Sequence, residues 1–494
     1  MIVARPASLA RWAQSLLLAL ALAGCGSNKD KPVEVLAIGD PGSLFQTGPR
    51  LPQPAQLLRS ATVEGLVGFD QQGRVVPALA DRWIVTDGGL SYIFRLRDGT
   101  WPDGSAITAD AARSSLQQAI GGLKGTALAL DLGGIAEIRT MAGRVVELRL
   151  SEPVPDLLQL LAQPELGLVW RGRGNGPMRL KRNGRIAALT PLAPEDRGLP
   201  SEEDWKEHAR TLNLRALPAQ SAIERFGRGE ADAVFGGRLE DLPRVDAVGI
   251  SRGALRVDPV TGLFGLAVVH GDGFIALPEN REALAMAIDR EGIADVFALD
   301  GWVATSRLVA PGLAGDAGTI GERWAGETLE VRRARAAARV AAWRASGKAA
   351  PVLRLAMPGG PGADLLFARL SDDFKAIGIE ARRVGIAAPA DLRLLDLVAR
   401  YPRPDWFLNQ LSCTNARGLC DSTADVLAAR ARATAEPVER LDLQSDAEAK
   451  LTKTNSYIPI GVPVRWSLIG GYLTGFAPNR WNVHPLLALA MRPR

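Results

Sequence analysis

Cysteine and histidine are scarce in this chain, with three of each among its 494 residues. A zinc site needs four ligands, and His208, His270 and His484 all lie far in sequence from the close pair Cys413 and Cys420. No Ser/His/Asp or Cys/His arrangement, carboxylate pair or Gly-Lys-Ser loop stands out either. We therefore expect no bound metal, no cofactor and no catalytic activity.

The start of the chain lacks an apolar run long enough to cross a bilayer. Residues 16–22 form a short apolar core behind Arg5 and Arg11, whereas a spanning helix needs about 20 apolar residues. Residues 1–24 are therefore predicted to be a signal peptide that is removed. The sequence Leu-Ala-Gly-Cys at its end resembles a bacterial lipobox, which would place an acyl anchor on Cys25; an ordinary secretory peptide with a chance cysteine is the alternative.

Net charge is low for so long a chain. The formal charge of +5 falls to +3 when Arg5 and Arg11 leave with the signal peptide. This small excess excludes the basic footprint of a nucleic-acid-binding protein. The remaining length, about 470 residues, allows two or three domains with sizeable cores.

The two cysteines that remain, Cys413 and Cys420, lie on a polar loop that contains Gly418. In an exported protein this spacing favours a disulfide, which stabilises a short ring by about 2–3 kcal/mol. Free thiols and a metal site are the alternatives.

Residues 63–110 carry the densest local pattern in the chain. A polar turn at 70–73 precedes a docked segment with Trp83 as its large apolar side chain. The alternation in residues 92–97, after the turn at 86–89, predicts a β-hairpin. A helix is expected to begin after Thr108, a typical capping residue. These features alone indicate only a small packed unit of strands and helix.

The order of these pieces resembles the signature of family 5 extracytoplasmic solute-binding proteins, which serve ABC importers of oligopeptides, dipeptides, nickel chelates and related solutes. Members read E-x-L-V-x-x-D, G, P-x-L-A-x-x-W, D-G-x-x-Y-x-F-x-L-R-x-G, W-x-D-G and T-A-x-D. The matching residues are Glu64, Leu66, Val67, Asp70, Gly73, Pro77, Leu79, Ala80, Trp83, Phe94, Leu96, Arg97, Gly99, Trp101, Asp103, Gly104, Thr108, Ala109 and Asp110. The helix at 280–290 and the Gly-Pro turn at 174–180 also resemble family segments.

This resemblance implies an α/β fold of the periplasmic-binding-protein type (class II, cluster C), with two lobes and an extra small α/β domain. The implied boundaries are residues 33–55, 165–262 and 458–494 for a discontinuous lobe I, 56–164 for the extra domain and 263–457 for lobe II. Dipeptide-binding relatives also carry a cysteine pair after a strand that lines the cleft.

Specificity is expected in residues 391–408. Relatives read D-x-x-L-x-x-W-x-x-D there, and in peptide binders the last acid pairs with the α-ammonium of the peptide. In this chain the Trp position falls on Leu397 and the acid position on Arg400. A cation there would repel an ammonium group and suits a carboxylate, phosphate or sugar acid instead. The alternative is that Arg400 faces solvent and that Asp396 or Asp405 takes the acid role.

Two tryptophans complete the candidate binding residues. Trp406 follows this motif, and Trp170 precedes the Gly-Pro turn, where it either reaches the cleft or packs in the core.

The resemblance implies a monomeric, lipid-anchored periplasmic receptor that passes a solute to an ABC permease and its ATPase. Gly26, after the acylated cysteine, leaves the choice between inner and outer membrane open. The alternative function is an envelope lipoprotein of the same fold that acts as a scaffold or sensor.

Overall fold

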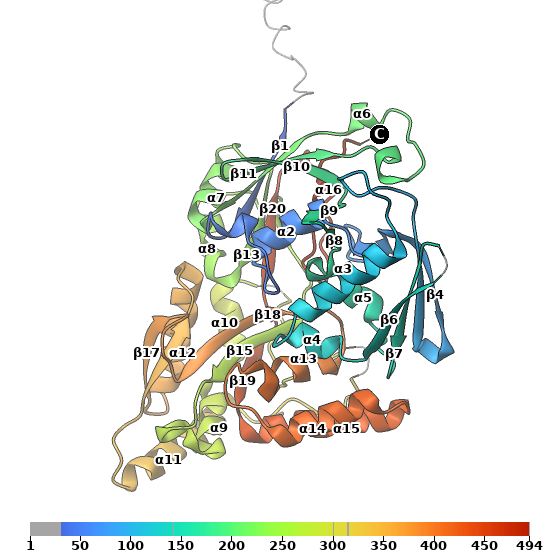
Figure 1. Ribbon diagram of the computed structural model, residues 1–494. Helices are drawn as coiled ribbons and strands as arrows, with labels where there is room; N and C mark the ends of the chain where they lie inside the picture. The colour runs from blue at the N-terminus through green and yellow to red at the C-terminus, as the bar shows by residue number, and fades with distance from the viewer. Residues whose placement is uncertain (1–30, 142, 300, 314–315, 494) are drawn as a thin grey trace, which may run out of the picture. The chain divides into compact units, whose positions relative to one another are not determined.

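The computed structural model describes residues 31–141, 143–299, 301–313 and 316–493. The predicted signal peptide and Cys25 lie outside the described residues. From Val33 onward the chain forms one compact unit with three main β-sheets (Figure 1). Within the described residues, no helix combines the length and the apolar character that crossing a membrane requires.

A seven-stranded sheet is centred on β1 (Val33–Ile38), which runs parallel to both of its neighbours. In spatial order the strands are β10 (Met178–Asn183), β11 (Ile186–Pro191), β12 (Leu212–Leu217), β1, β13 (Ala233–Arg238), β20 (Arg465–Ile469) and β14 (Leu255–Val257). Helices α2 (Gln53–Thr62) and α7 (Ala219–Gly227) contact this sheet, and α16 (Leu486–Leu489) contacts α2. Val33, Val35, Leu36 and Ala37 of β1 are buried, as expected for a central strand, and Ile38 at its end is partly buried.

A smaller antiparallel sheet holds the residues with the densest sequence pattern. Its order is β4 (Ala80–Thr86), β5 (Ser91–Leu96), β7 (Val145–Leu150) and β6 (Ile135–Met141). Phe94 and Val146 face each other across β5 and β7, and both are fully buried. Helix α3 (Ala109–Gly122) begins at Thr108, whose Oγ1 accepts a hydrogen bond from the Ala111 amide at 3.2 Å. The predicted hairpin and the predicted helix start are both confirmed.

The second large sheet has five strands. In spatial order they are β17 (Glu380–Gly385), β16 (Val352–Met357), β18 (Leu392–Val398), β15 (Gly262–Val268) and β19 (Tyr457–Gly461). Its helices are α9 (Pro278–Ala287), α10 (Arg290–Phe297), α11 (Leu329–Ala345), α12 (Pro361–Lys375), α13 (Pro404–Gln410), α14 (Ser422–Ala433) and α15 (Pro437–Thr454). We expected residues from 458 onward in the first sheet, but β19 pairs with β15 in this one. The domain boundaries themselves stay a prediction.

The chain crosses between the two large sheets at two neighbouring places, between β14 and β15 and again between β19 and β20. The Asp258 amide of the first crossing donates a hydrogen bond to the Arg465 carbonyl at 2.9 Å. The Asp258 carboxylate accepts a hydrogen bond from the Asn479 amide at 2.8 Å and lies 3.1 Å from a ring nitrogen of His484. The two crossings are therefore tied to each other and to the C-terminal segment.

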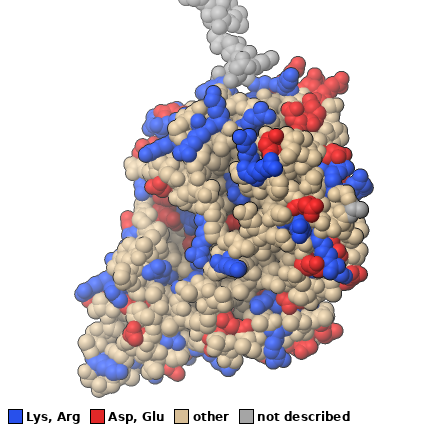
Figure 2. All heavy atoms as spheres, in the orientation of Figure 1, with Lys and Arg blue, Asp and Glu red and all other residues tan. Residues whose placement is uncertain are grey.

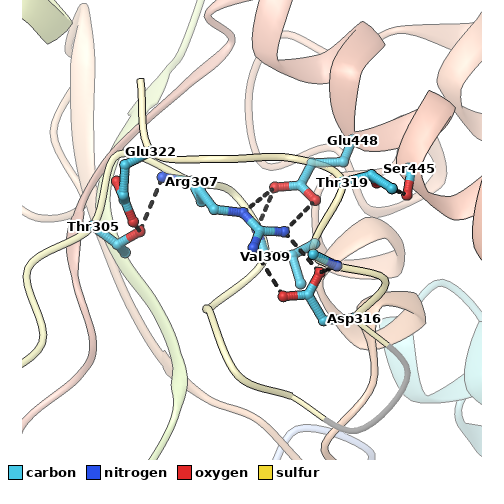
Figure 3. A network of polar contacts seen from close by, with 9 residues as sticks. Thr305, Arg307, Val309, Asp316, Thr319, Glu322, Ser445 and Glu448 are labelled. Carbon is cyan, nitrogen blue, oxygen red and sulfur yellow. Dashed lines mark hydrogen bonds and ion pairs between the residues drawn. The ribbon is translucent and has the colours of Figure 1, made fainter. Parts of the chain in front are cut away.

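A buried ion network fastens the long loop before α11 to α15 (Figure 3). Arg307 makes paired contacts with Asp316, at 2.8 and 3.1 Å, and with Glu448, at 3.3 and 3.0 Å. Burial alone would lower the pKa of Arg307, but the two carboxylates outweigh it and the pKa is raised. The guanidinium therefore stays charged inside the second large sheet's domain.

Candidate binding cleft between the two large sheets

A cavity of about 290 Å³ lies where the two large sheets meet. One wall comes from α2 and from Arg238 and Arg465, at the ends of β13 and β20. The opposite wall comes from the end of β18, including Asp396 and Leu397, and from Trp406 on α13. The cavity therefore touches both large sheets, as a site between two lobes must.

A second cavity of about 620 Å³ adjoins the first. The two cavities share Leu51, Pro52, Arg400, Gln410 and Arg417 as lining residues, so we treat them as two compartments of one cleft. The second compartment also reaches the loop before α2, the start of α4 (Ala127–Asp131) and the loop that contains Asn415.

Four of the six predicted binding residues line the first compartment: Asp396, Leu397, Arg400 and Trp406. Leu397, at the family's tryptophan position, is half-buried and presents an aliphatic wall. Trp406 is almost fully buried, and its indole Nε1 has no hydrogen-bond partner in the described part of the chain. Asp405 and Trp170 lie elsewhere.

Arg400 is held by an acidic side chain of the protein. Its Nη1 and Nη2 donate hydrogen bonds to the two carboxylate oxygens of Glu165 at 2.9 and 2.7 Å, and Nη1 also donates to Gln163 at 3.1 Å. Burial would raise the pKa of Glu165, but the adjacent Arg400 outweighs it and the pKa lies below its ordinary value. This position favours a cleft-lining Arg400 over the solvent-facing alternative, because its guanidinium compensates the buried Glu165 side chain, which is 2% exposed.

Asp396 is also fully engaged. Arg465 approaches both of its carboxylate oxygens, at 2.8 and 3.0 Å, and Arg238 lies 3.3 Å from one of them. Because both arginines extend from the seven-stranded sheet and Asp396 from β18, this cluster joins the two sheets. The negative charge of Asp396 is therefore already compensated by two arginines of the protein, which weakens its attraction for an ammonium group of a ligand.

Asp405 lies in a different cavity, of about 240 Å³, between the small sheet's domain and the helices α13 and α15. One of its oxygens accepts a hydrogen bond from Gln444 at 2.7 Å, and burial raises its pKa. In the same cavity, burial raises the pKa of Asp131 to about 6, although Asn409 and Tyr401 donate hydrogen bonds to it. The prediction that Asp405 could serve the cleft is not supported by this position.

Trp170 packs against the small sheet's domain. Its ring stacks on that of the buried Trp101, with centroids 6.4 Å apart, and the guanidinium of Arg171 lies over it. It lines neither compartment of the cleft. Of the two interpretations, the structure favours the packing role.

The structure also brings cleft residues together that the sequence analysis did not single out. Arg238 and Arg465 line the first compartment, Arg50 and Arg393 line the second, and Arg417 lines both. Cys413 and Cys420 form a disulfide that closes the loop holding Arg417. The sequence around these five arginines did not mark them as cleft residues, because arginine is common throughout the chain.

Charge on the visible face is otherwise mixed. Figure 2 shows basic and acidic side chains interspersed over most of this face. In the described residues, no group of three or more His, Cys, Asp or Glu side chains is placed to hold a metal ion.

Comparisons with known proteins agree with this architecture. Residues 74–418 match the family model described as "Bacterial extracellular solute-binding proteins, family 5 Middle". The "Probable deoxycholate-binding periplasmic protein YgiS" of Escherichia coli K12 is 32% identical over 149 residues, which cover 26% of this chain and 27% of that protein. The chain thus aligns with only about a quarter of this curated relative's length.

Solved structures of low sequence identity share the fold over nearly the whole chain. The Escherichia coli murein tripeptide binding protein MppA has a TM-score of 0.78 at 19% identity, covering 94% of this chain and 98% of that one. Haemophilus influenzae OppA, in complex with RPPGFSPFR, has a TM-score of 0.77 at 16% identity, with coverage of 94% and 99%. The predicted two-lobe fold is confirmed, and the chain belongs to the family 5 bacterial extracellular solute-binding proteins.

Proposed function

We propose that this protein is the solute-binding component of an ABC import system. It captures a small solute between its two lobes in the periplasm and presents the closed form to a membrane permease that a separate ATPase drives. The observation that carries this proposal is the cleft, because its walls come from both large sheets and its Asp396 cluster joins them. A solute that contacts both walls would bind the closed form more tightly and shift the open/closed equilibrium toward it.

Family membership and the description of YgiS as a periplasmic binding protein support the same function. YgiS and MppA are described as binding proteins, and OppA is described in complex with RPPGFSPFR, which supports a non-catalytic role. We expect the protein to work as a monomer, since each chain carries both walls of the cleft.

A thermal-shift screen tests this function. Purified mature protein is heated with di- to pentapeptides, sugar acids, opines and nickel chelates, one class at a time. A true ligand raises stability by RT ln(1 + [L]/Kd), which is about 2.7 kcal/mol at a hundredfold excess over Kd. Small-angle scattering with that ligand should show a more compact particle. No shift with any class would instead favour an envelope scaffold or sensor of the same fold.

The proposed membrane attachment is a separate point. We propose that Cys25 is acylated after removal of residues 1–24, which tethers the receptor to an envelope membrane. Cell fractionation of the Cys25→Ser variant should move the protein from the membrane fraction to the periplasmic fraction. Retention of this variant in the membrane fraction would overturn the proposal. Separating inner and outer membranes by density shows which membrane holds the parent protein.

A further inference from the structure

We propose that the cleft selects solutes that carry a carboxylate or phosphate group, and that Arg393 and Arg417, with Arg50 beside them, receive this group in the second compartment. This inference rests on the proposed function, because it names the ligand class of the same cleft. It is carried by the charges that line the two compartments and by how each of them is already paired.

The cleft has a strong excess of positive charge. Six arginines line its two compartments, against two acidic residues, Asp396 and Glu165. The arginines are Arg50, Arg238, Arg393, Arg400, Arg417 and Arg465. A cleft lined by charges of one sign concentrates the electric field and attracts solutes of the opposite sign.

Both acids of the cleft are occupied by the protein's own cations. Glu165 is paired with Arg400 through both oxygens, and Asp396 is paired with Arg465 and Arg238. An α-ammonium group entering the cleft would meet carboxylates whose charge these arginines already compensate, with further cations nearby. The cleft therefore disfavours a free peptide N-terminus by charge.

Three arginines have no such partner. Arg417 donates to Gln410 Oε1, Arg393 to the Ala388 carbonyl and Arg50 to the Gly125 carbonyl, each at 2.9 Å. None of the three makes an ion pair with an acidic side chain among the described residues. Each of these hydrogen bonds uses Nη2, and the Nη1 atoms of Arg393 and Arg417 make no hydrogen bond within the described part of the chain. An anion in this compartment would satisfy donors that the protein leaves unpaired.

The position of Arg417 is fixed by its surroundings. Gln410 extends from α13, accepts the hydrogen bond from Arg417 and also holds Asn415 through its backbone carbonyl at 3.2 Å. Burial and the neighbouring Arg50 lower the pKa of Arg417, so the compartment is costly for a cation without a counter-charge. A planar guanidinium held in this way suits bidentate binding of a carboxylate or phosphate.

The first experiment adds matched probes to the thermal-shift screen. One set is a tripeptide with its N-acetyl, C-amide and doubly blocked forms; the other is glucose, glucuronate and glucose 6-phosphate. We expect each binding scaffold to need its anionic group, and the carboxylate and phosphate arms distinguish the two sources. A neutral or purely cationic form that binds as tightly as its anionic counterpart would overturn this inference and leave the receptor function standing. No binder of any class would overturn the receptor function itself.

The second experiment uses calorimetry with the tightest anionic probe. Arg417→Gln and Arg393→Gln should each weaken binding by about 10- to 100-fold, the effect of losing a charge-assisted contact, while Arg417→Lys should weaken it less. Arg95→Gln, on the exposed face of β5, is the matched control and should leave the affinity unchanged. Circular dichroism melts verify folding of each variant. Unchanged affinity in folded Arg417→Gln and Arg393→Gln proteins would refute the assigned site.

Discussion

Arg400 and Glu165 are 235 residues apart in the chain and form a two-point ion pair at 2.9 and 2.7 Å. We expect Arg400→Ala to lower the free energy of unfolding by about 3–5 kcal/mol, because it leaves the buried Glu165 carboxylate without a cation. Urea denaturation of Arg400→Ala, Glu165→Ala and the double variant measures this. The double variant should lose less than the sum of the two single losses.

Additive losses in this cycle would contradict the pairing. Arg95→Ala serves as the control for removing an exposed arginine, and it should change stability by less than about 0.5 kcal/mol.

The contact of Arg238 with Asp396 holds the two large sheets together at the cleft. Replacing Arg238 by Gln removes one of the two cations on Asp396 but leaves Arg465 in place, so the fold should persist while the closed form becomes less populated. We expect small-angle scattering to report a larger radius of gyration for Arg238→Gln than for the parent protein without ligand. Identical scattering curves would show that this contact does not hold the lobes closed.

Arg307 fastens the long loop to α15 through Asp316 and Glu448 (Figure 3). Its side chain is 5% exposed and that of Glu448 is 4% exposed, so Arg307→Ala leaves two carboxylates that have lost their cation. We expect a loss of about 3–5 kcal/mol in thermal or urea unfolding.

Arg335→Ala is the comparison for Arg307→Ala. Arg335 pairs with Glu327 at 2.8 Å but is half exposed, so its removal should cost no more than about 1 kcal/mol. Equal losses from the two variants would mean that burial of the Arg307 network adds nothing to its contribution.

The raised pKa values of two buried acids, Asp131 and Glu240, determine how these groups make stability depend on pH. Burial raises the pKa of Asp131 to about 6, and burial together with the nearby Asp396 raises the pKa of Glu240 to about 7. In the unfolded chain both groups release their protons near pH 4, so between about pH 4 and pH 7 the folded state binds more protons. Stability from these groups is present below that window and is lost as the pH rises through it.

Thermal unfolding measured from pH 5 to pH 8 checks this direction. For Asp131 the shift corresponds to about 2–3 kcal/mol, since one pKa unit is about 1.36 kcal/mol. The Asp131→Asn and Glu240→Gln double variant should show a flatter dependence on pH than the parent. These pKa shifts would be contradicted if the parent protein became more stable from pH 5 to pH 8 and the double variant showed the same pH dependence as the parent.

Local features could be predicted from the sequence, because their causes are local. The alternation around Phe94 gave the hairpin of the small sheet, and Thr108 marked the start of α3. The family signature gave the two-lobe fold. Counting along the motif from Asp391 identified Arg400 as a departure from the family pattern, and Arg400 does line the cleft.

The partners of the cleft residues could not be predicted in this way. The pairing of Arg400 with Glu165, and of Asp396 with Arg465, joins residues from separate passes of the chain through the fold. Hydrophobic periodicity places β18 in a sheet, but it cannot tell which acid lies opposite. Asp405 follows the same motif as Trp406, yet it turns toward the α15 side, because neighbouring helix residues face different directions.

The disulfide between Cys413 and Cys420 bears on where in the cell the receptor becomes able to bind its solute. The ring limits the conformations of the loop that presents Arg417 to the cleft, and such bonds form outside the reducing cytosol. A newly made chain still inside the cell would carry Arg417 on a looser loop. Formation of the disulfide after export would then fix this loop, so that the receptor binds anionic solutes only in the periplasm, where it collects them.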